Sequence, residues 1–519
     1  MNRRRLLQSL GAAAATSACS KSSKPDRPNI LFILADDQSW LHTAANGTRG
    51  LNTPAQDRIA REGVRFTHSF CASPSCTPSR TAILSGRHIW QTGEAGLLYG
   101  AMPKELPLYT QLLKKAGYWV GFTGKGWGPG DWRALGLDRN PCGRQFNQVN
   151  HTPKPAPGLD ARDYAANFQA FLKERPNNDP FCFWFGSTEP HRLYDTGCGL
   201  RAGKKLEDVD LPPFLPDTPE VRSDILDYYM EIEWFDQQIA RFLKILEDMG
   251  ELDNTIIVVT SDNGMPFPRA KANLYDWGTH MPLAIRWGAK INGGRTVDDL
   301  VSHIDFAPTF LDVAGVKAPD GIAGKSLLPL LFSDKSGVID PAREQVVTAM
   351  ERHVVARPDY AGYPMRALRR RQYLYIRNFL PNEWPSGGDF ISSNKTTHGD
   401  IDGGPSKDSL LLPATRVKFR REVELTLNKR PSEELYDVTA DPGQLTNLAL
   451  NEVHSAVKLD MSRRLDEVLR ATNDPRIQGQ DPWRAYPYRQ TTGYGASFNT
   501  SLSREARDQA SGKATHKPE

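Results

Sequence analysis

The chain has 519 residues, of which 39% are hydrophobic and 24% charged, values typical of a globular protein large enough for two domains. The formal net charge is +4, and without residues 1–26 the acidic and basic side chains are equal in number. This balance argues against nucleic-acid binding, which needs a basic stripe, and the arginine run 369–371 is expected to be solvated.

Residues 1–26 have the features of an export signal. Three arginines at positions 3–5 precede the apolar stretch 6–15, which is too short to span a bilayer. The arginines and the two leucines after them resemble a twin-arginine signal, and Cys19 offers a site for lipid attachment. We therefore expect an exported bacterial protein, periplasmic or at the cell surface, with membrane contact only through a lipid anchor at Cys19.

An unbroken apolar run from Asn29 to Ala35 predicts a buried parallel strand. Asp36 and Asp37 follow it directly, at the edge where open α/β sheets place their ligands. Capping a helix or turn would need only one of these acids. Two adjacent carboxylates repel each other unless a cation lies between them, so the pair indicates metal ligands.

The segment 71–87 reads CASPSCTPSRTAILSGR and follows a predicted helix over 53–63 and a predicted strand over 64–70. Pro78 suits the first turn of a helix, which places Cys76 at its N-terminus and Arg80 one turn away. Backbone N–H groups there favour an anion. A lone cysteine is more often a buried hydrophobe or half of a disulfide, and only its neighbours favour a chemical role here.

The remaining cysteines leave the disulfide pattern open. If Cys19 is removed with the signal and Cys76 is modified, four remain, which permits one or two disulfides after export. These four are Cys71, Cys142, Cys182 and Cys198.

Three further predicted strands end in polar residues. The strands cover 118–123, 181–186 and 255–260, with helices predicted at 107–116, 162–174 and 218–250. Lys125 follows the first strand, His191 the second, and Asp262 with Asn263 the third. A lone histidine is more often structural than catalytic, and Asp-Asn-Gly is also a sequence that is common in turns. At a strand end in a chain that already offers an acidic pair, Asp262 and Asn263 read as the second half of a metal site.

After about residue 340 the pattern of predicted elements changes, because short strands and loops replace the alternation of strands and helices. Strands of a second sheet are predicted within 361–379, and an amphipathic helix over 452–471 is expected to pack on that sheet. The apolar face of that helix consists of Val457, Met461, Leu465, Val468 and Leu469. We expect an export signal at 1–26, a catalytic domain at 27–340, a C-terminal subdomain at 341–480, and a tail at 481–519 that is disordered from Ser501 onward.

The sequence C-T-P-S-R followed by A-I-L-S-G-R resembles the nucleophile signature of the formylglycine-dependent (type I) sulfatases. The resemblance extends from about Pro28 to Leu448 and includes a C-terminal E-L-Y-D…D-P…N-L pattern. It implies an α/β, alkaline-phosphatase-like fold, in which helices sandwich a mostly parallel sheet and a smaller C-terminal α+β subdomain carries an antiparallel sheet plus a helix. It also implies that a formylglycine-generating maturation enzyme converts Cys76 to formylglycine (3-oxoalanine), whose hydrate attacks sulfur.

The resemblance also assigns a metal site with one Ca²⁺ per chain. Its ligands would be Asp36, Asp37, Cys76 (as formylglycine), Asp262 and Asn263. Apart from position 76, these side chains offer only oxygen ligands, which suits a hard cation.

The remaining roles also follow from the resemblance. Arg80 would hold the hydrate, and Lys125 and Lys271 would neutralise the sulfate oxygens in the transition state. His191 would help to protonate the leaving group or drive the collapse that releases sulfate.

Two motifs resemble the N-sulfoglucosamine sulfohydrolase (sulfamidase) branch of the family. They are the Pro-His-Arg sequence at 190–192 and the Lys-Ala-Asn-Leu-Tyr sequence at 271–275. This branch implies a sulfated amino sugar as substrate, as at the end of a heparan-type chain. Sulfatases carry G-K-x-H after the strand that leads to Lys125, whereas this chain has Trp127 in place of the histidine. We expect this aromatic side chain to lie beside the site and to stack on a sugar.

Two alternatives remain open at this point. A phosphomonoesterase or phosphodiesterase of the same superfamily would use zinc, which prefers more histidine ligands than these strand ends offer. A non-catalytic, exported glycan-binding relative is the other alternative, and Trp127 is its only support. The sugar, the linkage and the oligomeric state do not follow from the sequence.

Overall fold

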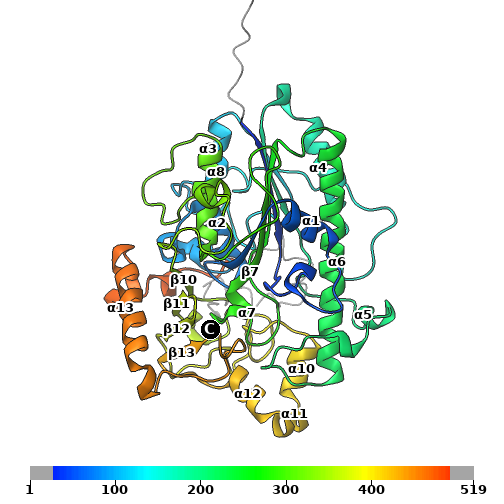
Figure 1. Cartoon of the computed structure of the whole chain (residues 1–519). Helices are drawn as coiled ribbons and strands as arrows, with labels where there is room; N and C mark the ends of the chain where they lie inside the picture. Colours follow the sequence, from blue (N-terminus) through cyan, green and yellow to red (C-terminus); the bar gives the residue numbers. More distant parts are fainter. Residues whose placement is uncertain (1–26, 491–519) are drawn as a thin grey trace, which may run out of the picture.

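The computed structural model describes residues 27–490, which form a large α/β unit and a smaller second sheet (Figure 1). The predicted export signal, the lipid attachment site at Cys19 and the predicted disorder from Ser501 lie outside the described residues. Within residues 27–490, no helix combines the length and apolar character needed to cross a bilayer.

Nine strands of the described chain form the large sheet, in the order β4-β3-β5-β1-β6-β7-β2-β8, with β9 paired to β2. They are β1 (Asn29–Ala35), β2 (Val64–Phe70), β3 (Trp119–Gly124), β4 (Arg144–Gln145), β5 (Phe181–Gly186), β6 (Thr255–Ser261), β7 (His280–Arg286), β8 (Arg295–Val297) and β9 (Val301–Ser302). Only β7 runs antiparallel to its neighbours, so the predicted mostly parallel sheet is confirmed.

The central strand β1 explains why helices cover both faces of this sheet. Its side chains alternate, as in any strand, and every one of them is buried. Ile30 and Phe32 face a core shared with α2 (Cys76–Ser85), α3 (Tyr109–Lys115) and α8 (Phe306–Val313). Leu31 and Ile33 face a core shared with α1 (Pro54–Glu62), α4 (Tyr164–Lys173) and α6 (Pro219–Asp248). Figure 1 shows these two groups of helices on opposite sides of the sheet.

The second sheet is antiparallel and packs against α13 (Ser455–Ala471), as predicted. Its strands are β10 (Gln345–Met350), β11 (Met365–Arg370), β12 (Tyr373–Asn378) and β13 (Glu433–Asp437). All five predicted apolar residues of α13 take part in this core. The described residues contain six further short helices: α5 (Cys198–Arg201), α7 (Asp276–Thr279), α9 (Leu328–Leu331), α10 (Pro405–Leu411), α11 (Pro413–Lys418) and α12 (Arg420–Leu427).

The opposite face of the second sheet supports the loop between β6 and β7. Met365 and Ile376 of this sheet form a cluster with Leu274 and Tyr275 of that loop. The Tyr275 hydroxyl donates a hydrogen bond of 2.7 Å to Glu434, which ties the loop to β13. The loop also carries Lys271, so the second sheet helps to place a predicted site residue.

The structure contradicts one prediction about arginine exposure and answers the open question about the disulfides. The prediction that the 369–371 run is solvated is wrong for Arg369, which is 4% exposed and pairs with Asp276 at 2.9 Å. Its burial follows from its place on β11 within the second sheet. The five cysteines of the described residues are free thiols, so neither disulfide left open by the sequence is present there.

Candidate active site

The predicted site residues converge at one edge of the large sheet. Asp36 and Asp37 follow β1, Lys125 follows β3, His191 follows β5, and Asp262 and Asn263 follow β6, while Cys76 and Arg80 belong to α2 and Lys271 to the β6–β7 loop. Because parallel strands end at the same edge, residues far apart in sequence meet there.

The most buried part of the site consists of the polar residues that follow β1 and β6, namely Asp36, Asp37, Asp262 and Asn263. The Nδ2 of Asn263 donates to Asp37 Oδ1 at 2.6 Å, and the backbone N–H of Asp37 donates to Asp262 Oδ1 at 3.1 Å. One oxygen each of Asp36 and Asp262 lies within 4.8 Å of the Cys76 sulfur and of the other. All four polar residues are at most 1% exposed. Asp37 has a φ of 80°, uncommon outside glycine, at the turn that presents both carboxylates.

The donor set fits a hard cation. Asn263 Oδ1 is buried and has no hydrogen-bond partner among the described residues, and an amide oxygen is a ligand that calcium accepts. Burial raises the pKa of Asp37 to about 7 and that of Asp262 to about 6, which shows the cost of ionising these acids without further positive charge. A divalent cation among them would supply that charge.

Cys76 is the first residue of α2, as predicted, and its side chain is 2% exposed. Its thiol donates to Asp36 Oδ1 at 3.4 Å. Burial and the neighbouring Asp36 raise the pKa of this thiol well above its usual range. The preceding residue, Ser75, is held by a 2.9 Å hydrogen bond to the imidazole of His353. Gly86 ends α2 with a φ of 67°, a conformation that favours glycine.

Arg80 joins α2 to two strand ends. Its Nε donates to Asp262 Oδ2 at 2.8 Å, and its Nη1 donates to the carbonyl oxygens of Lys125 and Gly126 at 2.8 and 2.9 Å. The guanidinium also lies 3.8 Å from Asp36. Arg80 is therefore a buried brace of the site as well as a positive charge within it.

Two lysines from different elements pair with the adjacent aspartates that follow β1. Lys125 pairs with Asp36 Oδ2, and Lys271 pairs with Asp37 Oδ2 at 2.7 Å. Burial alone would raise the pKa of Asp36, but Lys125 and the other cations together lower it below its ordinary value. Each lysine thus opposes one of the adjacent carboxylates and reduces the repulsion between them.

His191 lies at the opening of the site, where its side chain is 24% exposed. Its Nδ1 hydrogen-bonds the Arg192 carbonyl at 2.6 Å, and because a carbonyl can only accept, Nδ1 carries the proton. Its Nε2 then faces Asp37 Oδ2 at 3.8 Å. Burial, together with Lys271, lowers the pKa of His191 to about 4. Arg192 itself forms a two-pronged pair with Asp224 of α6, both distances being 2.7 Å, and so anchors the histidine loop.

Two residues at the site do not follow from the sequence reasoning. Asp402 contributes a carboxylate 3.0 Å from Lys271 Nζ, and His353 contacts Ser75 beside the nucleophile. Asp402 precedes two glycines, a sequence typical of a turn. His353 follows a strand of the second sheet and belongs to no recognisable motif. Neither local pattern contains a signal that distinguishes it from an ordinary loop.

The expectation that Trp127 stacks on a sugar is wrong. Its side chain is 3% exposed and belongs to the core under α2, α3 and α8. The indole Nε1 donates to Thr81 Oγ1 at 2.8 Å, which satisfies its polar atom inside the protein. A buried indole presents no face to a substrate.

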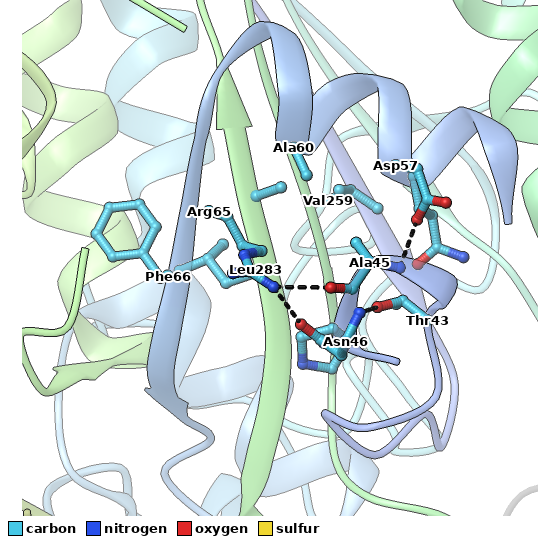
Figure 2. A pocket seen from close by; sticks show the side chains of 12 residues that line it. Thr43, Ala45, Asn46, Asp57, Ala60, Arg65, Phe66, Val259 and Leu283 are labelled. Atoms are coloured by element: carbon cyan, nitrogen blue, oxygen red, sulfur yellow. Dashed lines mark hydrogen bonds between the residues drawn. The ribbon is translucent and has the colours of Figure 1, made fainter. Parts of the chain in front are cut away.

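A small cavity near the site edge is not a substrate pocket. It lies between α1, the turn at 43–46 and the strands β2 and β7, and its volume of about 20 Å³ accommodates one water molecule. Figure 2 shows the Arg65 guanidinium pointing to the Ala45 carbonyl and the Asn46 side chain, with Asp57 accepting from the Ala45 N–H. These contacts fix the loop that follows the Asp36–Asp37 pair.

Comparison with characterised proteins gives a consistent result. An ulvan-active sulfatase of Formosa agariphila is 27% identical over 500 residues, covering 87% of this chain and 76% of the relative. The human N-sulphoglucosamine sulphohydrolase is 28% identical over 507 residues, covering 87% of this chain and 92% of the relative.

Similar structures share the fold. One, solved in complex with its substrate D-glucosamine-2-N,6-O-disulfate, has a TM-score of 0.62 at 21% identity and covers 86% of this chain and 98% of its own. The fold class expected from the sequence is therefore confirmed. A family model described as sulfatase matches residues 28–316, more than half of the chain. The chain belongs to the sulfatase family.

Proposed function

We propose that this protein hydrolyses sulfate esters or sulfamates of a sulfated saccharide. The observation that carries the proposal is one buried cluster, which combines a cysteine at a helix N-terminus, three aspartates, one asparagine and three cationic side chains. Such a cluster stabilises charge that develops on a tetrahedral oxyanion, because its charged groups are already in place. Membership of the sulfatase family supports the same chemistry.

The cofactors form part of the proposal. Asp36, Asp37, Asp262 and Asn263 would hold one calcium ion, together with an oxygen of formylglycine at position 76. When bound, the ion would polarise the sulfate oxygens, and formylglycine would supply the attacking hydroxyl. Calcium prefers oxygen to sulfur ligands, so an oxygen in place of the Cys76 thiol completes a hard donor set.

Each remaining side chain has a role that its position permits. Arg80, braced against Asp262, would orient the nucleophile at the start of α2. Lys125 and Lys271 would neutralise sulfate oxygens as the bond to the leaving group breaks. His191 would take up a proton at Nε2 and pass it to the leaving group, because this atom faces the site while Nδ1 is engaged by a carbonyl.

We assign a sulfated amino sugar as the preferred substrate. The Pro-His-Arg motif supports this choice, since Arg192 anchors the loop that carries His191. The similarity to the human N-sulphoglucosamine sulphohydrolase also supports it. The ulvan-active relative is about equally similar, so an O-sulfated saccharide is the competing substrate class.

The cellular setting is also proposed from the sequence. Residues 1–26 would direct export to the periplasm or cell surface, with Cys19 as a lipid anchor, and a maturation enzyme would modify Cys76. The catalytic domain would be 27–340, followed by a subdomain at 341–480 that supports Lys271 through the second sheet. Residues 481–490 pack against the protein, with Trp483 and Tyr488 each 3% exposed.

A release assay tests the proposal. Purified protein is offered N-sulfated glucosamine, O-sulfated sugars and phosphate monoesters and diesters, and inorganic sulfate and phosphate are measured. We expect sulfate release that Cys76→Ala abolishes, and mass spectrometry of the peptide 71–87 should show formylglycine in active protein. Phosphate release alone would establish the superfamily alternative, and release of neither ion would establish a non-catalytic binding protein. Activity with only the unmodified thiol would exclude the formylglycine mechanism.

A further inference from the structure

Asp402 differs from every other carboxylate in the site. It lies in the irregular segment between β12 and α10, and its Oδ2 is 3.0 Å from Lys271 Nζ. Its side chain is 23% exposed, whereas those of Asp37 and Lys271 are 0% and 5% exposed. One of its oxygens lies within 4.8 Å of both His191 and Asp37. Asp402 therefore lies on the more exposed side of the cluster, beside His191.

The charges of the aspartate, lysine and arginine side chains in the site explain why this position matters. With a bound cation to keep the acids ionised, the buried side chains would be balanced, because three carboxylates oppose three cations: Asp36, Asp37 and Asp262 against Arg80, Lys125 and Lys271. A divalent cation adds two positive charges. Asp402 cancels one of them, so a single negative charge on the substrate makes the whole site neutral.

We propose that Asp402 makes this site discriminate by charge, favouring a singly charged sulfate ester or sulfamate over a doubly charged anion. The inference rests on the proposed function for its substrate class. Without Asp402 the loaded site would carry two positive charges, and a dianion would match it best. At an effective dielectric constant of about 20, one unit charge about 4–8 Å away changes the relative affinity of a dianion and a monoanion by roughly 30- to 1,000-fold, and the partial exposure of Asp402 to water reduces this to about tenfold or more.

The same charge would also assist product release. Hydrolysis converts a singly charged ester and water into an alcohol, a proton and the doubly charged sulfate ion. A site balanced for one negative charge holds the product less tightly than a site balanced for two. Asp402 acts here through the charge of the site and through its contact with Lys271.

Binding of two ions of similar shape tests the proposal. Inorganic sulfate is a dianion, and the sulfamate ion is a monoanion with the same tetrahedral sulfur. Isothermal titration calorimetry measures both affinities in the protein as isolated and in three kinds of variant. Asp402→Asn and Asp402→Ser remove the charge, Asp402→Glu keeps it, and Asp408→Asn removes an exposed charge from the neighbouring helix α10 as the matched control.

We expect the ratio of sulfate to sulfamate affinity to rise at least about tenfold in the two uncharged variants. Asp402→Glu and Asp408→Asn should leave the ratio within about twofold of the wild type. Unfolding midpoints show which uncharged variants are folded, and two different replacements guard against a folding defect in one. An unchanged ratio in a folded, uncharged variant would overturn the inference. Since ion binding needs no turnover, this result is separate from sulfate release by the wild type, which tests the proposed function.

Discussion

Replacing Arg80 with methionine should destabilise the protein even when no metal is bound. The guanidinium is fully buried and pairs with Asp262 at 2.8 Å, while two backbone carbonyl oxygens accept from it at 2.8 and 2.9 Å. Methionine fills much of the same volume but removes the donor to Asp262 Oδ2 and to the Gly126 carbonyl, while the Lys125 carbonyl keeps only its hydrogen bond from the Trp184 indole. Removing one partner of a buried ion pair costs about 3–5 kcal/mol, and we expect Arg80→Met to fall in this range.

Urea unfolding of chelator-treated protein, followed by tryptophan fluorescence, measures this cost. A double-mutant cycle with Asp262→Asn isolates the pair, and we expect a coupling energy of about 1–3 kcal/mol because the two side chains contact each other. Arg420→Met is the matched control, since Arg420 is exposed and pairs only with Glu424, and it should leave the midpoint unchanged. Additive single effects, or a wild-type midpoint in Arg80→Met, would show that Arg80 does not brace the site.

Three other predictions address the metal, the histidine and the tryptophan. Chelation should lower the thermal unfolding midpoint and added Ca²⁺ should restore it, whereas Asp37→Asn should respond to neither; a midpoint insensitive to both treatments in the wild type would refute the calcium site. His191→Ala should lose most turnover on saccharides but much less on an activated aryl sulfate, whose leaving group needs little protonation; equal losses would mean that His191 binds sulfate instead. Trp127→Phe should cost about 1 kcal/mol, because Thr81 loses the indole donor, and should leave the saccharide KM unchanged; a large rise in KM would place the indole at the substrate after all.

The large sheet could be predicted because its central strands are continuous apolar runs. The run ending at Ala35 and the run starting at Thr255 are buried on both faces, so their composition alone separates them from surface strands. The direction of β7 could not be predicted in this way. Its residues are equally buried, and whether it runs parallel or antiparallel depends on the path of the 264–279 loop and not on composition.

Some residues of the site could also be predicted from the sequence, and others could not. Residues placed by strand ends or by the helix that starts at Cys76 were predictable, since local chemistry positions them. Asp402 and His353 reach the site only because the second sheet packs beside the first, and no spacing in the sequence encodes that contact. Trp127 shows the converse error: a motif position suggested exposure, but apolar neighbours and the Thr81 hydroxyl offer its side chain a better environment inside the protein.

The packing of Tyr488 sets an order of events during synthesis. Tyr488 belongs to the same apolar cluster as Cys76, Leu98 and Val354, so the last described residues help to enclose Cys76. About four hundred residues separate Tyr488 from Cys76, and a ribosome adding about 5–20 residues per second needs roughly 20–80 s to make them. Throughout that interval the cysteine lacks part of its final cover. An enzyme that modifies Cys76 therefore has its best access to the growing chain, before the C-terminal residues arrive.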